Sequence, residues 1–120
     1  MIKTLTTSRK LVSLSMLLFL SIPLFAQWNF STQYFKIHIN QKGFITSMKN
    51  TTVDPEREFC PADKPSPVMS LYDGSKKVYY YPEKAAYQKL KSILTLSFSN
   101  GSIAKIKFIP QKKYLKMSLI

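Results

Sequence analysis

The sequence is poor in the residue types that most chemical sites require. Its 120 residues include one cysteine (Cys60), one histidine (His38) and three glycines. One cysteine cannot form an internal disulfide, and one histidine with one cysteine cannot make a zinc cluster. Three scattered glycines leave no glycine-rich loop for phosphate. We therefore predict no metal site and no cofactor.

Acidic residues are also scarce, and their placement excludes an obvious catalytic pair. The chain has 6 Asp and Glu against 18 Lys and Arg, a net charge of +12. Four of the six acids, Asp54, Glu56, Glu58 and Asp63, lie in one proline-rich stretch over 50–67. Paired carboxylates for glycoside hydrolysis would have to come from that stretch. Acids this close in a loop more often serve turns, so we predict no catalytic residue.

The apolar residues that are present begin with an export signal. A start with three basic residues precedes an apolar stretch over 11–25, which Pro23 interrupts and Ala26 follows. The stretch is shorter than the ~20 apolar residues of a membrane-spanning helix. We predict a signal peptide over 1–26, a mature domain over 27–120 without a transmembrane span, and a secreted or periplasmic location. An uncleaved N-terminal anchor is the alternative.

Alternating hydrophobicity predicts that the mature domain is all-β. Apolar residues recur at every second position over 34–39, 92–99, 102–109 and 115–119, as in half-buried strands. Turn residues separate predicted hairpins over 34–48, 68–81 and 92–109. Asn100-Gly101 predicts a two-residue type I′ turn in the last hairpin. We expect an antiparallel β-sandwich or a partial supersandwich of about seven strands.

Three segments outside these hairpins leave more than one interpretation. Residues 82–91 allow one short helix that begins at Pro82, where proline is tolerated. Cys60 is expected to be a small buried apolar residue, with a free thiol or an intermolecular bridge as alternatives. Within the first hairpin, His38 is expected on the polar face of its strand. Alternation continues to Ile120, so we expect the domain to be incomplete at its C-terminus, with an open strand edge.

The positive charge of the mature chain lies entirely in its second half. Removal of 26 residues leaves 94 with a net charge of +9; residues 27–63 are neutral, and residues 64–120 carry eleven lysines and two acids. Lysines that alternate with apolar residues are typical of a solvated sheet face. The functional alternative is a surface for a polyanion, with these candidates: Lys105, Lys107, Lys112, Lys113 and Lys116. The mature chain has only one arginine and no recognition-helix pattern, which argues against a nucleic-acid partner.

Aromatic residues supply candidates for contact with sugars, because flat rings pack on the faces of sugar rings. The run Tyr79-Tyr80-Tyr81 must place rings on both faces of its strand, so at least one is expected to be exposed. Trp28 is the fourth stacking candidate. Packing in the core and across strands is the alternative for all four residues.

The chain resembles a known class of domain in several segments. Leu24-Phe25-Ala26-Gln27 is similar to the signal-peptide ends of Bacteroidetes-type secreted proteins. Residues 35–45, 66–72 and 96–102 are similar to strands of the galactose-mutarotase-like β-sandwich domain at the N-terminus of large secreted glycoside hydrolases. In such enzymes the catalytic carboxylates lie mainly in a following barrel, so the resemblance implies no catalytic residue here.

These observations support one function and two alternatives. The first is a non-catalytic β-sandwich segment of a secreted carbohydrate-active enzyme, which packs and presents polysaccharide. Its partners would be a polysaccharide or the remainder of a larger enzyme. The alternatives are a freestanding secreted binding protein for acidic polysaccharide and a cell-envelope structural protein without a small ligand.

Overall fold

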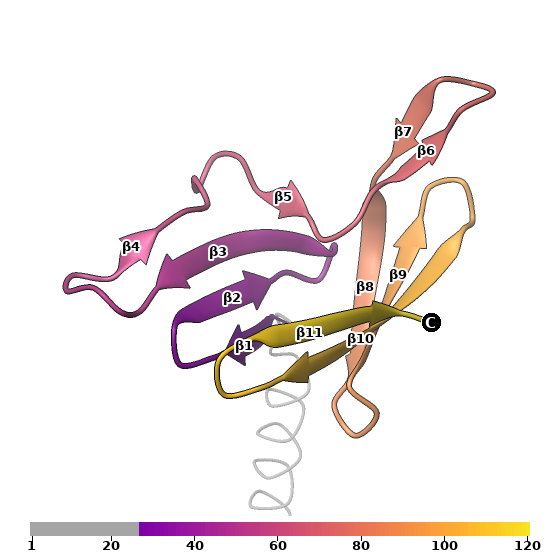
Figure 1. The fold of residues 1–120 in the computed structure, drawn as a ribbon. Coiled ribbons are helices and arrows are strands. Elements are labelled where there is room, and N and C mark those ends of the chain that lie inside the picture. Colours follow the sequence, from indigo (N-terminus) through magenta and orange to yellow (C-terminus); the bar gives the residue numbers. More distant parts are fainter. Residues whose placement is uncertain (1–26) are drawn as a thin grey trace, which may run out of the picture.

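The computed structural model describes residues 27–120, which form eleven strands and no helix (Figure 1). The predicted signal peptide over 1–26 lies outside the described residues. The N-terminal sheet contains β1 (Trp28–Ser31), β2 (Phe35–Ile39), β3 (Phe44–Asn50), β4 (Arg57–Glu58) and β5 (Ser66–Pro67). The C-terminal sheet contains β8 (Pro82–Gln88), β9 (Ile93–Phe98), β10 (Ile103–Pro110) and β11 (Leu115–Leu119). Strands β6 (Leu71–Asp73) and β7 (Val78–Tyr80) form a separate hairpin.

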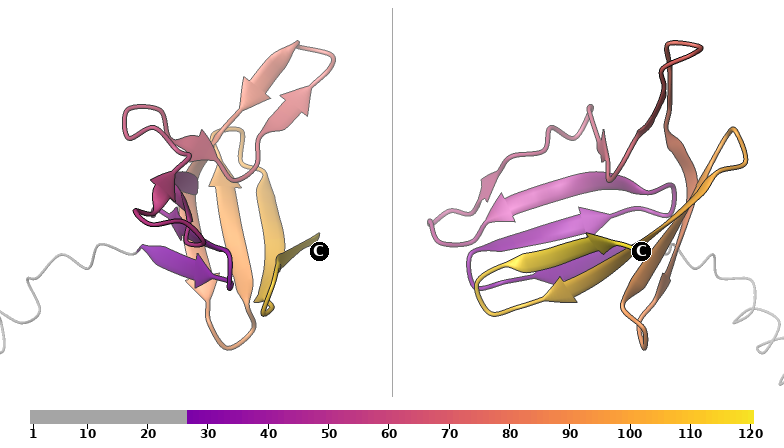
Figure 2. Two further views of the ribbon diagram at one scale, coloured as in Figure 1. Left: turned by 60° about the vertical axis from the view of Figure 1, so that its left-hand side comes forward. Right: turned by 45° about the vertical axis from the view of Figure 1, so that its right-hand side comes forward.

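Every strand pairs with its neighbours in the antiparallel sense, which confirms the predicted all-β, antiparallel fold. The N-terminal sheet has the order β1-β2-β3-β4, with β5 paired to the other end of β3. The C-terminal sheet has the order β11-β10-β9-β8. The hairpin of β6 and β7 projects beyond both sheets (Figures 1 and 2). It is the most isolated part of the fold.

The core lies between the inner faces of the two sheets. Period-2 alternation places apolar side chains of β9 and β10 on one face, as the sequence predicts. Phe30 of β1 stacks on Phe108 of β10, with ring centroids 4.9 Å apart. Tyr87 of β8 meets the edge of Phe30 at 5.2 Å, so aromatic contacts join the sheets. The buried cluster consists of Phe30, Ile37, Ile39, Ala85, Leu94, Leu96, Phe98, Ala104, Ile106 and Phe108.

Two of the hairpin turns use a three-residue loop that ends in a glycine. Gly43 donates its N–H to the carbonyl of Asn40 (3.0 Å) and has a φ of 87°. Gly101 makes the equivalent bond to Phe98 (3.0 Å) at a φ of 83°. This geometry is a turn followed by a left-handed residue, a common hairpin connection. The hairpin predicted at Asn100-Gly101 is confirmed, but the two-residue type I′ turn is wrong, because among these turn residues only the glycine has a positive φ.

The segment that allows a helix, 82–91, contains strand β8 instead. The register of β8 against β9 shifts between Pro82 and Lys84, so an extra residue interrupts the alternation. The shift leaves Pro82 and Ala85 both buried at a spacing of three, which imitates one helical turn in the sequence. Ala85 donates its N–H to the carbonyl of Gln41 (2.8 Å), and this bond ties β8 to the β2–β3 turn.

The remaining differences from the sequence prediction concern short strands. β1 was not predicted, and the stretch 50–67, predicted as a loop, contains the two-residue strands β4 and β5. The hairpin predicted over 68–81 is present, but its strands are only three residues long. Asp73-Gly74 is a sequence signal for a two-residue turn, but the loop is longer, since Asp73 pairs with Val78. Short strands carry too few residues for a clear alternation.

Candidate functional site

Three exposed tyrosines lie on the β6–β7 hairpin and directly after it. Tyr72 and Tyr79 are directly opposite each other in the register, with ring centroids 4.8 Å apart and an interplanar angle of 41°. Tyr81 follows two residues after Tyr79, and the exposed fractions of Tyr72, Tyr79 and Tyr81 are 57%, 58% and 51%. We call these three residues the tyrosine cluster. Tyr72 and Tyr79 are therefore two adjoining exposed rings on the projecting hairpin, and Tyr81 is exposed directly after β7.

The turn of this hairpin is held by one carboxylate. Asp73 Oδ1 accepts hydrogen bonds from the N–H of Ser75 (2.9 Å), the hydroxyl of Ser75 (2.6 Å) and the N–H of Lys76 (3.2 Å). The Ser75 hydroxyl and then the Lys76 N–H hold the pKa of Asp73 below its ordinary value. Lys77 closes the turn at a positive φ of 54°. Asp73 therefore fixes the approach of β6 to β7 and so the spacing of Tyr72 and Tyr79.

The structure divides the four predicted stacking residues into two groups. Tyr79 and Tyr81 are exposed. Tyr80 points to the other face of β7 and packs against the core, and Trp28 is half-buried against Tyr87 with ring centroids 6.4 Å apart. Sequence reasoning missed Tyr72. Tyr72 lies opposite Tyr79 because the loop between the strands has four residues. The sequence does not reveal that loop length, so it does not predict the pair.

The predicted polyanion residues lie on the C-terminal sheet and its turn. Lys105 and Lys107 alternate with the buried residues of β10, so they project from the outer face of the sheet. Lys116 of β11 lies on the same face, because its neighbour Ser118 is opposite Lys107. Lys112 and Lys113 lie in the exposed β10–β11 turn. The structure therefore brings three of the five candidates onto one face and leaves two at its end.

No salt bridge neutralises the lysines of this face within residues 27–120. By register, the paired outer-face residues of the sheet are apolar, hydroxyl, amide or lysine, with Lys84 of β8 as a fourth lysine. Glu83, exposed at the register shift of β8, is the one acid of this sheet and lies next to Lys84. The single salt bridge of the described residues joins Lys36 Nζ to Glu56 Oε1 (3.6 Å) in the N-terminal half. Four lysines on one sheet face give a local positive potential.

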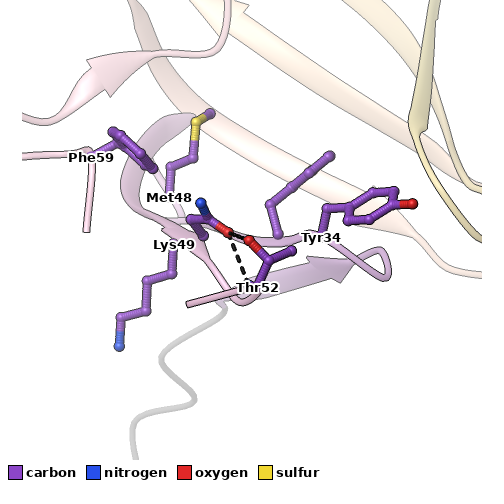
Figure 3. Close-up of a pocket in the computed structure, with 7 residues that line it drawn as sticks. Tyr34, Met48, Lys49, Thr52 and Phe59 are labelled. Carbon is purple, nitrogen blue, oxygen red and sulfur yellow. Dashed lines mark hydrogen bonds between the residues drawn. The ribbon is translucent and has the colours of Figure 1, made fainter. Parts of the chain in front are cut away.

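A shallow hollow of about 350 Å³ opens at the end of the N-terminal sheet (Figure 3). Phe59 and Met48 lie on one side of it and Tyr34 on the other. Asn50 Oδ1 accepts hydrogen bonds from the N–H (2.9 Å) and the hydroxyl (2.6 Å) of Thr52, so the side-chain oxygen of Asn50 already has two donors. The hollow is lined by Tyr34, Phe35, Met48, Lys49, Asn50, Thr52 and Phe59. None of the predicted site residues lies in it.

The acidic stretch beside this hollow has a structural use. Glu58 Oε1 accepts hydrogen bonds from the N–H groups of Met48 (2.9 Å) and Cys60 (3.2 Å), and its Oε2 accepts one from the Ser47 hydroxyl (2.8 Å). Desolvation acts to raise the pKa of Glu58, but these hydrogen bonds and the Lys49 charge outweigh it. The pKa therefore lies below its ordinary value of 4.5. The hydrogen bonds to Ser47 and Met48 hold Glu58, and with it β4, against β3.

Cys60 and His38 form no reactive group with these acids. Cys60 is buried and free, and its thiol donates to the carbonyl of Ile45 (3.3 Å). His38 lies in the middle of β2, between Asn29 and Ser47 of the neighbouring strands. Across the described residues, no three His, Cys, Asp or Glu side chains gather as ligands for a metal ion.

Comparison with known proteins gives no relative from which a function can be transferred. The chain matches no protein-family model, no curated protein and no solved structure. The resemblance to galactose-mutarotase-like domains therefore stays a prediction. Over 27–120 the structure also contains no helix with the length and apolar character needed to span a membrane. Function has to be argued from the tyrosine cluster and the lysine face.

Proposed function

We propose that this chain is a non-catalytic β-sandwich segment of a secreted carbohydrate-active enzyme, and that its tyrosine cluster contacts polysaccharide. The observation that carries the proposal is the pair Tyr72 and Tyr79, whose rings lie 4.8 Å apart and more than half exposed on a projecting hairpin. Export through residues 1–26 to the periplasm or the exterior is part of the same proposal. The chain would hold substrate and leave the chemistry to a catalytic domain.

The exposed ring area makes sugar contact energetically reasonable. An aromatic side chain buries roughly 150–250 Å² when fully covered, so a half-exposed tyrosine offers about 100 Å². Covering that area contributes roughly 2–3 kcal/mol per ring before the entropy of binding is subtracted. Tyrosine suits the task because its ring packs on C–H groups while its hydroxyl bonds to sugar hydroxyls. Two adjacent rings therefore suffice for weak, repeated contact along a polymer.

Affinity electrophoresis in gels that contain laminarin, xylan or polygalacturonate tests the proposal. We expect at least one polymer to retard the chain, and Tyr79→Ala to weaken that retention about tenfold, the equivalent of about 1.4 kcal/mol. Tyr114→Ala is the matched control, because Tyr114 is 57% exposed but lies in the β10–β11 turn. Equal effects of the two substitutions, or no retardation by any polymer, would reject the proposal.

The lysine face supports a second candidate, a freestanding secreted binding protein for acidic polysaccharide. Its supporting observation is the group of four outer-face lysines, none of which forms a salt bridge. Binding through lysines weakens steeply as salt rises, because the Debye length falls from about 10 Å at 0.1 M to about 3 Å at 1 M. Binding through tyrosine rings depends little on salt.

Salt and substitution together separate the two candidates. The double change Lys105→Gln and Lys107→Gln should abolish salt-sensitive retention by polygalacturonate and leave laminarin retention unchanged. Lys36→Gln and Lys42→Gln remove the same charge from the N-terminal sheet and its turn and serve as the control. A chain that no polymer retards under any condition fits the third alternative, a cell-envelope structural protein.

A further inference from the structure

The apolar inner face of the C-terminal sheet continues beyond the part that the N-terminal sheet covers. Phe108 and Ile106 of β10 lie opposite Met117 and Leu119 of β11 in the register, so all four side chains share one face. Phe108 is 1% exposed, whereas Met117 and Leu119 are 58% and 66% exposed. Coverage therefore stops between β10 and β11. The face of β11 is apolar but open.

The backbone of β11 is open along the same edge. Ile120 donates its N–H to Lys105 (3.0 Å), and Gln111 donates to the carbonyl of Tyr114 (2.7 Å), so even-numbered residues of this strand bond to β10. The N–H and C=O groups of Leu115, Met117 and Leu119 consequently point away from β10. No strand within residues 27–120 pairs with this edge, because β11 ends the order β11-β10-β9-β8 (Figure 2).

The side chains on the two faces of β11 indicate which kind of segment would fit beside this edge. On the inner face, an added strand would place its side chains beside Leu115, Met117 and Leu119, which favours apolar residues. On the outer face its side chains would lie beside Lys116, with Lys107 one strand further, and no acid is present there. Like charges opposite each other in a sheet are unfavourable, and opposite charges are favourable.

We propose that the free edge of β11 binds an extended peptide segment whose residues alternate between apolar and acidic. Such β-augmentation takes its affinity from main-chain hydrogen bonds and its specificity from alternate side chains. A second copy of this chain fits less well, because its β11 would bring another Lys116 and a second strongly basic sheet to the same edge. This interface is independent of the tyrosine cluster on the distant hairpin.

Fluorescence anisotropy with the whole 120-residue chain and two labelled peptides tests the inference. One peptide is a capped nonamer that alternates valine and glutamate, and the other alternates valine and lysine. We expect the acidic peptide to bind at least about tenfold more tightly, and its binding to weaken as salt rises. Equal binding of the two peptides, or binding of neither, would overturn the inference.

Two changes test whether the edge itself is used. Met117→Pro removes an N–H that points away from β10, whereas Met117→Ala keeps that N–H and shortens the side chain. We expect the proline variant to bind the acidic peptide about fivefold more weakly than the alanine variant, as for one lost hydrogen bond. An acidic peptide methylated on alternate backbone nitrogens supplies the same test without a change to the protein. If neither Met117→Pro nor methylation of the peptide weakens binding, the assignment is contradicted. A dimer of this chain that Met117→Pro dissociates would also contradict it.

Discussion

The β2–β3 turn provides a sharp test of how the two sheets join. A Cβ placed on Gly43 would lie 2.7 Å from Leu96 Cδ2 and 3.1 Å from Pro82 Cβ. Leu96 belongs to the fully buried part of the core, so any shift of its side chain disturbs its packing. Gly43 also accepts a hydrogen bond from the Val68 N–H (3.0 Å), which restrains its backbone. Gly43→Ala should therefore force the C-terminal sheet away from the turn.

Two effects determine how much Gly43→Ala lowers the free energy of unfolding: the positive φ and the overpacking by the new Cβ. Gly101, the other glycine with a positive φ, shares only the first effect. An alanine at positive φ costs roughly 1–2 kcal/mol, and Gly101, with a φ of +83°, has the same conformation as Gly43 at +87°. Gly101 has no heavy atom within 4 Å of its added Cβ, so Gly101→Ala carries this first term alone. Overpacking adds about 1–3 kcal/mol at Gly43. Both changes stiffen the unfolded chain equally, so the expected difference between the two is about 1–3 kcal/mol.

Urea unfolding monitored by tryptophan fluorescence measures this difference. Trp28 is the only tryptophan of the chain and lies 6.4 Å from Tyr87 across the two sheets. Its emission should therefore report their separation. We expect Gly43→Ala to lower the urea midpoint clearly more than Gly101→Ala does, with similar slopes. Equal losses would mean that the turn does not press on Leu96, and the described sheet packing would be wrong.

Two further predictions concern the core and the acidic stretch. Phe108→Ala should lower the free energy of unfolding by about 3–5 kcal/mol, because Phe108 is buried and stacked on Phe30. Phe59→Ala, at an exposed position, should lower it by less than about 1 kcal/mol in the same urea assay. Similar losses would contradict the described core. Glu58→Gln should cost about 1 kcal/mol at pH 7 through weakened hydrogen bonds. Since the folded-state pKa of Glu58 is depressed, the unfolded state takes up the proton first. The stabilisation is therefore present above the ordinary value of 4.5 and lost as the pH falls through the depressed pKa, and a wild-type-to-variant gap that stays constant from pH 7 to pH 3 would refute this role.

The sequence predicts the central strands because one face of each is buried. Leu94, Leu96 and Phe98 alternate without interruption in β9, and Ala104, Ile106 and Phe108 do so in β10. Where the alternation is interrupted, prediction fails for a physical reason. The register shift at the start of β8 gives Pro82 and Ala85 a helix-like spacing, and only pairing with β9 shows that the segment is a strand.

The candidate site is predictable in its residue types but not in its arrangement. Tyr79 and Tyr81 follow from alternation along one strand, whereas Tyr72 joins them through the register of the hairpin. That register depends on a loop in which the Asp73 carboxylate accepts three hydrogen bonds. The half-buried states of Trp28 and Tyr80 depend on contacts with the core that are distant in sequence. Local pattern contains no information about such contacts.

Isothermal titration calorimetry on the tyrosine cluster tests the proposed function most directly. The titrant is the polysaccharide that gives retention in electrophoresis, and the proteins are the unchanged chain, Tyr79→Phe, Tyr79→Ala and Tyr114→Ala. We predict that Tyr79→Phe keeps most of the affinity because it keeps the ring, that Tyr79→Ala loses about tenfold, and that Tyr114→Ala loses nothing. Affinity that Tyr79→Ala leaves unchanged would contradict the proposal that this cluster holds polysaccharide.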